Sequence, residues 1–273
     1  MPILSKDTQV CISLAARPTN LGTRFHNFLY DELGLNFIYK AFTTTDLAGA
    51  VSGMRALGFR GAAISMPFKE TIIPMLDSLE PVAAAIESVN TVVNDDGVLT
   101  GSNTDFQAVL ELLKAANIHG SSKILVRGSG GMAKAVVAAF EKAGFANLTV
   151  TARNQQTGAR LAAKYGFTFD ENALEKPGFD LLVNVTPIGM AGPEEFELSF
   201  SQELISAATA VFDVVAFPAE TPLVLEGRAQ GKALITGAEV IDLQAAIQFE
   251  KYTGIKISPE QIARASKFSR AHT

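Results

Sequence analysis

The stretch most suggestive of chemistry is a glycine-rich loop, Gly128-Ser129-Gly130-Gly131-Met132-Ala133. It follows the apolar run Lys123 to Arg127 and opens an Ala/Val-rich helical pattern, which indicates a strand, a tight turn and a helix. The first Gly permits the turn, the second lets the backbone approach a pyrophosphate, and Ala133 lets helix and strand pack closely. A tight turn without a ligand is the alternative. The free N–H groups at the helix start attract phosphate, so we expect all six residues to bind a dinucleotide.

The end of the next predicted strand distinguishes NAD from NADP. An NAD site places an acidic residue on the ribose about 20 residues after the loop. No Asp or Glu lies between Glu141 and Asp170, and the predicted strand is followed instead by Arg153. An arginine there can bind a 2′-phosphate with a fixed charge and several donors, although a solvated surface arginine is the alternative. We therefore expect NADP, with NAD less favoured.

Three polar segments near the ends of predicted strands are hard to explain by packing: Ser65-Met-Pro-Phe-Lys69-Glu70, Ser88-Val-Asn90-Thr91 and Ser102-Asn-Thr104-Asp105. Taken alone, Lys69 would be a solvated residue at a helix start and Asp105 a helix cap. Together the segments bring an ammonium, a carboxylate and several hydroxyl and amide groups to one side of the predicted domain. Oxidation of an alcohol needs a group that moves the hydroxyl proton, and this set can supply it.

Other residues are weaker candidates for that proton transfer. Tyr252 and Lys256 have the Tyr-x-x-x-Lys spacing of some dehydrogenases, but the Thr-Gly between them indicates that the helix ends there. His119 lies in a predicted loop and His272 is next to the carboxyl terminus. We expect His26 to be a partly buried structural residue.

Composition limits the class of protein. The 273 residues are enough for two domains, and 48% hydrophobic with 19% charged residues is typical of a globular chain. A net charge of -5, a pI near 5.3 and no Lys/Arg cluster argue against nucleic-acid partners. Cys11 is the single cysteine and there are three histidines, so neither a disulfide framework nor a Cys/His zinc site is expected, and no metal. The lack of a long apolar run argues against a membrane span or signal peptide, and a reducing cytoplasm fits best.

The elements that must position these residues alternate between strand and helix. In the middle of the chain a helix is predicted from Met132 to Phe145. The predicted strands there are Lys123 to Arg127, Leu148 to Ala152, Asp180 to Val185, Ala210 to Val215 and Ala233 to Thr236. Such β-α alternation indicates a parallel sheet covered on both faces.

The amino-terminal part also alternates, but without a phosphate loop. Its predicted strands are Gln9 to Leu14, Phe37 to Phe42, Ala62 to Ser65 and Ser88 to Asn94, with helices at Arg24 to Leu33 and Asp46 to Leu57. Two closing helices are predicted at Ala238 to Tyr252 and Pro259 to Phe268. We therefore expect a two-domain α/β protein, in which residues 106–236 form a doubly wound Rossmann domain for NADP. Residues 1–105 would form an α/β substrate domain, with the helices of 237–273 packed back on it.

Several motifs occur in the order typical of one enzyme family. They are Pro67-Phe68-Lys69-Glu70, Val89-Asn90-Thr91, Asn103-Thr104-Asp105, the Gly128 to Ala133 loop, Asn184-Val-Thr186-Pro-x-Gly189-Met190, Thr221-Pro222 and Gly237 to Gln244. With these motifs the chain resembles the shikimate/quinate dehydrogenase family over nearly its whole length.

The resemblance implies reversible oxidation of a ring alcohol by NAD(P), in chorismate and aromatic amino acid biosynthesis. It implies that Lys69 and Asp105 form a catalytic dyad and that Thr186 and Gly237 contact the cofactor. The residues implied to contact hydroxyls of the cyclic acid are Ser65, Asn90, Asp105 and Gln244.

The chain departs from the family where the substrate carboxylate is held. The family's Ser-x-Ser-Pro segment before a His-Asn pair corresponds here to Asn20, Gly22 and Thr23, and its tyrosine before Thr-Pro falls on Ala216. Asn20 and Thr23 can still donate to a carboxylate. A second arginine of the dinucleotide clamp is replaced by Thr157. With these departures the chain most resembles the shikimate dehydrogenase-like subgroup of the family. The resemblance therefore predicts the family's reaction with poor use of shikimate, or with a preference for quinate or a related acid.

Two other interpretations remain open. A non-catalytic NADP-binding regulator with the same architecture would retain the loop, although an intact Lys69 and Asp105 argue against it. A folate-cofactor dehydrogenase of similar plan is disfavoured by Asn90-Thr91 and Asn103-Thr104-Asp105. The expected partner is a small cyclic hydroxy acid, and the sequence is compatible with a homodimer.

Overall fold

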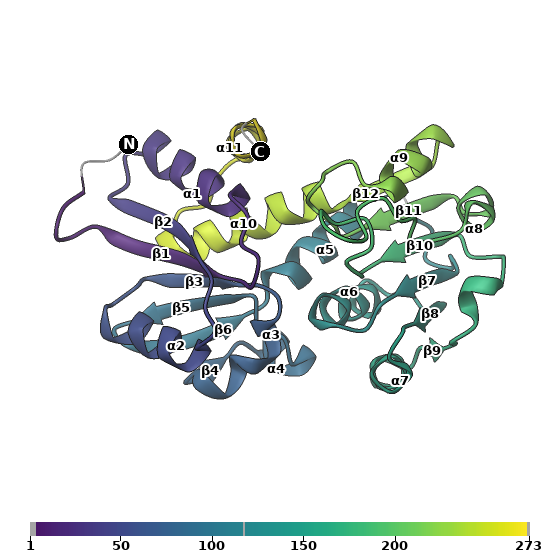
Figure 1. Ribbon diagram of the computed structural model, residues 1–273, viewed down its shortest axis with the longest axis horizontal. Coiled ribbons are helices and arrows are strands. Elements are labelled where there is room, and N and C mark those ends of the chain that lie inside the picture. The colour runs from purple at the N-terminus through teal and green to yellow at the C-terminus, as the bar shows by residue number, and fades with distance from the viewer. Residues whose placement is uncertain (1–3, 117, 272–273) are drawn as a thin grey trace. The chain divides into compact units, whose positions relative to one another are not determined.

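A computed structural model describes residues 4–116 and 118–271 of the chain (Figure 1). The chain divides into two compact units, one formed by Met1–Thr104 with Asp242–Thr273 and the other by Asp105–Ile241. We call them unit 1 and unit 2. The chain passes from one to the other at the start of α5 (Thr104–Ala115) and within α10 (Gly237–Thr253).

Unit 1 contains a six-stranded sheet with the order β2-β1-β3-β5-β6-β4. Its strands are β1 (Gln9–Leu14), β2 (Phe37–Phe42), β3 (Gly61–Ile64), β4 (Ser78–Leu79), β5 (Thr91–Asp95) and β6 (Val98–Ser102). Its other elements are α1 (Leu21–Glu32), α2 (Leu47–Ala56), α3 (Phe68–Thr71), the 3₁₀ turn η1 (Ile73–Met75), α4 (Pro81–Ile86), most of α10, and α11 (Pro259–Arg270).

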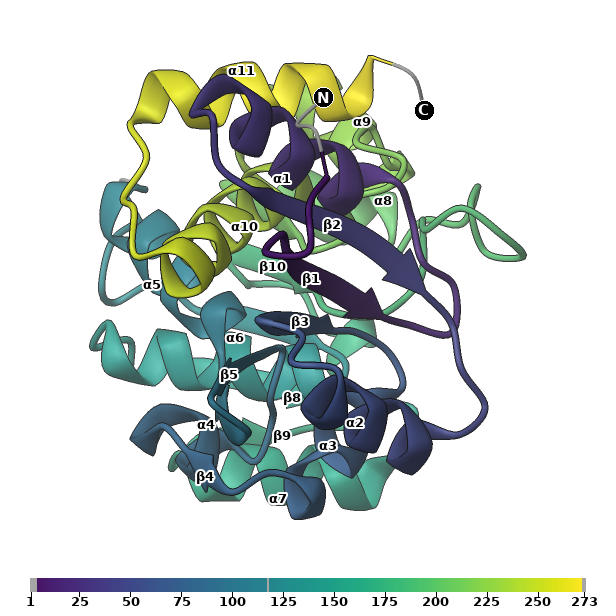
Figure 2. The ribbon, with the colours of Figure 1, turned by 90° about the vertical axis from the view of Figure 1, so that its left-hand side faces the viewer.

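Side chains that alternate along β1 enter two separate cores. Cys11 packs with residues of α1, α10 and α11, whereas Ile12 and Leu14 pack with residues of α2 and α4. An apolar residue on each face of a strand is the pattern expected when helices cover both sides of the sheet. Figure 2 shows α1, α10 and α11 over β1 and β2.

The carboxyl-terminal helix α11 packs on α1. The rings of Phe28 and Phe268 lie 5.1 Å apart, and Arg264 donates two hydrogen bonds to the carboxylate of Glu32. Ser258 and Gln261 form a capping box that starts the helix. None of the described helices is long and apolar enough to cross a membrane.

The unit-1 sheet is mixed, which corrects one detail of the expected strands. We predicted a strand from Ser88 to Asn94, but β5 begins at Thr91, and it runs antiparallel to both β3 and β6. The Asn90 segment therefore precedes its strand rather than following it. Because of the reversed direction, the start of β5 lies beside the ends of β3 and β6. The three polar segments still meet at one edge of the sheet.

Unit 2 is a Rossmann fold in which all the paired strands are parallel. Its strands, in the order β12-β11-β10-β7-β8-β9, are β7 (Ile124–Arg127), β8 (Leu148–Thr151), β9 (Thr168–Phe169), β10 (Leu181–Asn184), β11 (Ala210–Asp213) and β12 (Ala233–Thr236). Its other elements, after α5, are α6 (Gly131–Lys142), α7 (Gln155–Lys164), η2 (Ala173–Glu175), α8 (Gln202–Ala207) and α9 (Pro222–Ala229).

The strand order of unit 2 reverses direction at β7. From there β8 and β9 extend to one side, and β10, β11 and β12 to the other. In open α/β sheets ligands bind at the carboxyl ends of the strands next to such a switch point. The glycine-rich loop follows β7 directly, so it occupies this position.

Candidate active site

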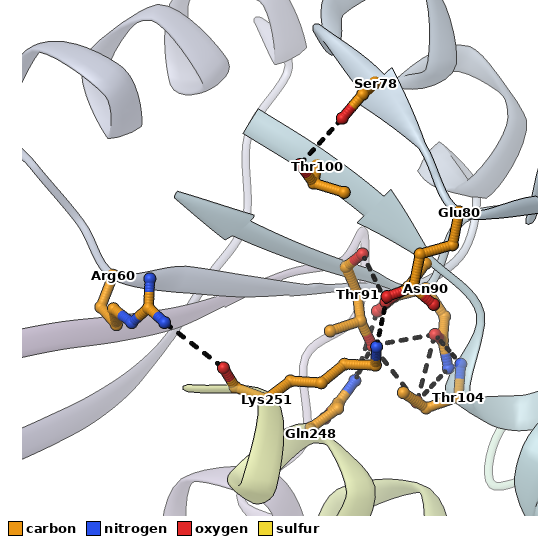
Figure 3. A network of polar contacts seen from close by, with 10 residues as sticks. Arg60, Ser78, Glu80, Asn90, Thr91, Thr100, Thr104, Gln248 and Lys251 are labelled. Atoms are coloured by element: carbon orange, nitrogen blue, oxygen red, sulfur yellow. Dashed lines mark hydrogen bonds and ion pairs between the residues drawn. The ribbon is translucent and has the colours of Figure 1, made fainter. Parts of the chain in front are cut away.

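The centre of the unit-1 site is a buried polar network (Figure 3). Asn90 Oδ1 accepts a hydrogen bond from the Thr104 N–H at 2.7 Å, and Asn90 Nδ2 donates to Thr104 Oγ1 at 3.0 Å. Thr91 Oγ1 also donates to Asn90 Oδ1, at 2.9 Å. All three residues are 3% exposed or less. Buried amides with several partners are rigid, so Asn90 is held in one orientation.

Helix α10 adds two glutamines to this network. Thr104 Oγ1 donates to Gln244 Oε1 at 3.3 Å, and Gln248 Nε2 donates to Thr91 Oγ1 at 2.9 Å. The two glutamines are one turn apart, so they lie on the same face of the helix. Gln244 is half-buried and Gln248 is buried. We predicted Gln244 but missed Gln248, which its spacing of four from Gln244 could have indicated.

The end of α10 is tied to the sheet by charged side chains. Lys251 Nζ lies 2.5 Å from Glu80 Oε1, and Arg60 Nε donates to the Tyr252 carbonyl at 2.9 Å. Arg60 also donates to the carbonyl of Asn94 at 2.8 Å. Figure 3 shows Arg60 pointing toward the Lys251 carbonyl, while the Lys251 side chain runs past Gln248 toward Glu80. These contacts hold the end of α10 against the sheet, close to the point where Gln248 bonds Thr91 of β5.

Ser65 and Lys69 lie just beyond β3. The Ser65 N–H donates to the Leu14 carbonyl at 2.9 Å, and the Ser65 side chain is exposed. Lys69 is a half-buried residue of α3, and its carbonyl accepts from the Val89 N–H at 2.8 Å. This bond joins the backbone of Lys69 to the segment that carries Asn90.

Asp105 is the second residue of α5 and is 7% exposed. The helix begins at Thr104, so Asp105 lies within the first turn and is not the cap that its type suggests. Asp105 follows Thr104, whose backbone N–H donates to Asn90. Asn90 therefore fixes the backbone directly before Asp105. Lys69 belongs to unit 1 and Asp105 to unit 2, and the pairing of their side chains stays a prediction.

The altered carboxylate anchor lies at the start of α1. Asn20 precedes the helix and makes no side-chain capping bond. A Cβ added at Gly22 would have the Tyr39 ring as its nearest neighbour, at 3.7 Å or more, so there is room for a side chain. The Thr23 hydroxyl is buried and has no hydrogen-bond partner among the described residues.

The histidines do not join this site. His26 is fully buried, more than the partial burial we predicted, and its ring stacks on Tyr39 at 4.4 Å. Burial lowers the pKa of His26 to about 3, against a weaker opposing effect of Gln248, so the ring is neutral near pH 7. His119 bonds the Ser121 hydroxyl in an exposed loop, and His272 lies outside the described residues.

Tyr252 lies in the last turn of α10, whereas Lys256 lies beyond the end of the helix. Helix α10 ends at Thr253, and Gly254 follows with a φ of +74°, which confirms that Tyr252 and Lys256 do not share a helix face. Within residues 4–116 and 118–271, no group of three His, Cys, Asp or Glu side chains is arranged to hold a metal ion.

The glycine-rich loop has the local geometry that a dinucleotide requires. Gly128 has a φ of +129°, and a Cβ there would lie 2.8 Å from the Val185 side chain. A Cβ at Gly130 would meet nothing within 4 Å, and this residue begins α6 without a side-chain cap. Ala133 is fully buried. Open space beside an uncapped helix start fits a pyrophosphate.

The next loop carries the residues that would meet the ribose. Asn154 Oδ1 accepts from the Thr157 N–H at 3.1 Å and caps α7. The Ser129 and Thr157 hydroxyls lie 2.7 Å apart, so the threonine that replaces the family's second arginine contacts the glycine-rich loop. Arg153 is exposed between β8 and α7. Its charge is thus available to a phosphate.

Thr186 and Gly237, expected to contact the cofactor, lie at the carboxyl edge of the same sheet. Asn184 Oδ1 accepts from the Thr186 N–H at 3.1 Å and from its hydroxyl at 2.6 Å. A Cβ at Gly237 would lie 2.2 Å from the Val215 carbonyl oxygen, so no other residue fits there. Sequence reasoning missed Asp213, whose buried carboxyl accepts from Asn184 at 3.0 Å.

Comparison with known proteins identifies the family. A model of the shikimate dehydrogenase substrate binding domain matches residues 20–92. A shikimate dehydrogenase-like protein of Haemophilus influenzae is 55% identical over 269 residues, covering 98% of this chain and 99% of that protein. The chain belongs to the shikimate dehydrogenase family. The family membership predicted from the motifs is confirmed.

Solved structures of this family share the fold. The shikimate 5-dehydrogenase-like protein HI0607 is 54% identical, with a TM-score of 0.90, over 98% of this chain and all of that one. The Thermus thermophilus shikimate 5-dehydrogenase, solved with NADP(H) and shikimate, is 31% identical with a TM-score of 0.84. That match covers 96% of this chain and 99% of the other. The predicted two-part α/β architecture with a Rossmann fold is confirmed.

Proposed function

We propose that this chain is an NADP-dependent oxidoreductase that reversibly oxidises a ring hydroxyl of shikimate or a related cyclic hydroxy acid. The observation that carries the proposal is the buried network of Asn90, Thr104 and Gln244, which ends one residue before Asp105. Fixed amide and hydroxyl groups of this kind suit a ligand with several hydroxyls, because each can donate or accept. The Thermus thermophilus relative, solved with shikimate and NADP(H), supports the same assignment.

Lys69 and Asp105 are the residues we assign to proton transfer. When bound, NADP would supply the acceptor for the hydride on the carbon that carries the hydroxyl. The hydroxyl proton must leave at the same time, and the Lys69 side chain stabilises the developing alkoxide and relays that proton. The Asp105 carboxylate orients the lysine and the substrate hydroxyl. In the reverse direction the same dyad returns the proton to the carbonyl oxygen.

Unit 2 supplies the cofactor site in this proposal. The loop from Gly128 to Ala133 holds the pyrophosphate at the start of α6. Arg153 binds the 2′-phosphate, and no acidic residue follows β8 where an NAD ribose would need one. Thr186 and Gly237, which follow β10 and β12, contact the cofactor.

The substrate is the finer part of the proposal. With Gly22 and Ala216 in place of hydroxyl-bearing residues, the substrate carboxylate meets fewer donors than in the family pattern. Asn20 and Thr23 remain as residues whose side chains can donate to the carboxylate. We therefore propose that shikimate is turned over slowly, or that quinate or a related acid is preferred.

The domain roles follow from the same assignment. We propose that residues 1–105 with the helices of 237–273 form the substrate domain, and that residues 106–236 form the NADP domain. A reducing cytoplasm suits the free, buried thiol of Cys11.

A panel of shikimate, quinate and aminoshikimate, each with NADP and with NAD, tests the function. We expect reduction of NADP with at least one acid and much weaker reduction of NAD. NADP binding without turnover of any acid would support the regulator instead. Shikimate turnover on the order of 100 per second, typical of a fast metabolic enzyme, would contradict the slow-shikimate part alone.

A further inference from the structure

Asp213, the last residue of β11, is a carboxylic acid that the assigned chemistry does not use. It is fully buried at the end of an apolar strand. Burial of a carboxylate is costly unless hydrogen bonds compensate, so a protein retains one where those bonds are needed. Three donors reach it: Thr221 Oγ1 at 2.6 Å, Asn184 Nδ2 at 3.0 Å and the Val215 N–H at 3.1 Å.

The three donors come from different segments of unit 2. Asn184 ends β10, and its amide also donates to the Ile188 carbonyl at 3.0 Å, while its Oδ1 holds Thr186. Thr221 is the N-cap of α9 and accepts from the Val224 N–H at 3.2 Å. One carboxyl group thus joins the turn after β10, the end of β11 and the start of α9.

The same carboxyl also fixes the Val215 backbone, against which Gly237 packs. Its bond to the Val215 N–H holds in place the residue whose own carbonyl oxygen would be 2.2 Å from a Cβ at Gly237. Gly189, at the end of the Thr186 turn, packs on Thr221 in a similar way, with a Cβ there 3.3 Å from the threonine side chain. A shift of the Asp213 carboxyl would therefore move both segments expected to line the cofactor.

The three groups that donate to the carboxyl are neutral. Asn184 faces it from β10, Thr221 from α9 and the Val215 N–H from its own chain, and none of them titrates. On β12, Thr236 is paired with Asp213, and its hydroxyl bonds Glu239, which is the titratable group on that side. Burial outweighs the three hydrogen bonds and raises the pKa of Asp213 to about 6.

We propose that Asp213 is a positioning residue for the cofactor, which sets the affinity for NADP by holding the Thr186 turn and the Val215 backbone in a single arrangement. It acts through Asn184, Val215 and Thr221. This role rests on the proposed function in one respect, namely that NADP is the ligand of unit 2.

The test compares Asp213→Asn with Asp180→Asn. Asp180 precedes β10 at the opposite edge of the sheet, where its carboxylate accepts from the Lys123 N–H, so its replacement is a matched control. The dissociation constant of NADP is measured by calorimetry without substrate, from pH 5 to pH 8, on protein shown to be folded by circular dichroism. At pH 8 we expect Asp213→Asn to bind NADP at least five-fold more weakly than wild type, and Asp180→Asn to stay within two-fold.

The pH profile separates positioning from a general loss of stability. Wild type and the control should lose affinity relative to Asp213→Asn as the pH falls through about 6, because their carboxyl becomes protonated. The 2′-phosphate of the ligand also ionises near pH 6, but this effect is common to all three proteins and cancels in the comparison. A lower melting temperature with unchanged NADP affinity and pH profile would overturn the proposal.

If Asp213→Asn does not fold, a second pair of variants tests the same role. Thr221→Ser keeps the hydroxyl that donates to Asp213, and Thr221→Val removes it. We expect the serine variant to bind NADP like wild type and the valine variant to bind more weakly, whereas equal affinities would overturn the proposal. Wild-type protein that binds no NADP at all would contradict the proposed function itself, and this role with it.

Discussion

Asn90 and Thr104 are joined twice, through the Thr104 N–H at 2.7 Å and the Thr104 hydroxyl at 3.0 Å, although fourteen positions separate them in the chain. This pair connects the start of β5 to the start of α5, and so to Asp105. The geometry of the site thus depends on a side-chain amide.

The change Asn90→Ala is expected to reduce both stability and activity. It leaves the buried Thr104 N–H without its acceptor, which costs about 1–3 kcal/mol of unfolding free energy. It also frees the backbone before Asp105, so kcat/KM per folded molecule should fall by more than ten-fold. Asn94→Ala is the control, since Asn94 is buried at the other end of β5 and bonds the Gly97 N–H. Urea unfolding measures the stability of each variant, and steady-state kinetics measure its kcat/KM. An equal loss of kcat/KM in both variants would contradict the role assigned to Asn90.

Local patterns were enough to predict much of the fold. The bounds of β1, β2 and β12 agree with the prediction, because each is a short run of mostly apolar residues. The glycine-rich loop was equally predictable. Glycine is needed at Gly128 and Gly130 because of the local turn and the helix start that follows it, and both can be recognised from neighbouring residues.

Features that depend on distant pairing were not predictable in the same way. Strand β6 was missed because Val98–Ser102 contains a glycine and lacks an apolar run, and it forms by pairing with β5. Strands β4 and β9 have two residues each and leave no pattern. Asp213 was missed because its three donors come together only in the folded sheet.

The change Gly22→Ser is expected to improve the use of shikimate. The site has room for the new side chain, whose Cβ would lie 3.7 Å or more from Tyr39. A hydroxyl that donates to a carboxylate contributes about 1.5–3 kcal/mol, so kcat/KM for shikimate should rise by about ten-fold. Gly22→Ala adds the Cβ without the hydroxyl and controls for helix stability at this position. Equal kcat/KM values for the serine and alanine variants would show that no carboxylate is bound there.

The change Arg153→Ala is expected to remove the preference for NADP. The exposed guanidinium would no longer meet the 2′-phosphate, so the KM for NADP should rise by about ten-fold or more. The KM for NAD, which lacks this phosphate, should change by less than two-fold. Arg160→Ala, also exposed but on α7, is the control. If the ratio of the two KM values were the same in both variants, Arg153 would not bind the phosphate.

Stability at acid pH is expected to depend on His26. Burial lowers its pKa in the folded protein to about 3, from 6.5 in the unfolded chain. The unfolded state therefore binds more protons between these values, and stability is lost as the pH falls below 6.5, by about 1.4 kcal/mol per pH unit. Asp213 acts in the opposite direction, because its raised pKa favours proton binding by the folded state as the pH falls through about 6.

A comparison with His26→Phe isolates the histidine, since Asp213 is present in both proteins. Between pH 7.5 and pH 5, wild type should lose about 2 kcal/mol more unfolding free energy than the variant. Urea unfolding at the two pH values measures this difference. Parallel losses in the two proteins would mean that His26 is not buried in its neutral form.

The most direct test of the proposed function is the turnover number for NADP reduction with the best acid of the panel, in wild type, Lys69→Met and Asp105→Asn. Both replacements are close in size to the native side chain, and NADP affinity should be unchanged. Loss of a group that transfers a proton lowers the rate by about 10² to 10⁴, and we predict a fall of this size in each variant. Unchanged turnover in either variant, with the fold intact, would contradict the Lys69 and Asp105 mechanism.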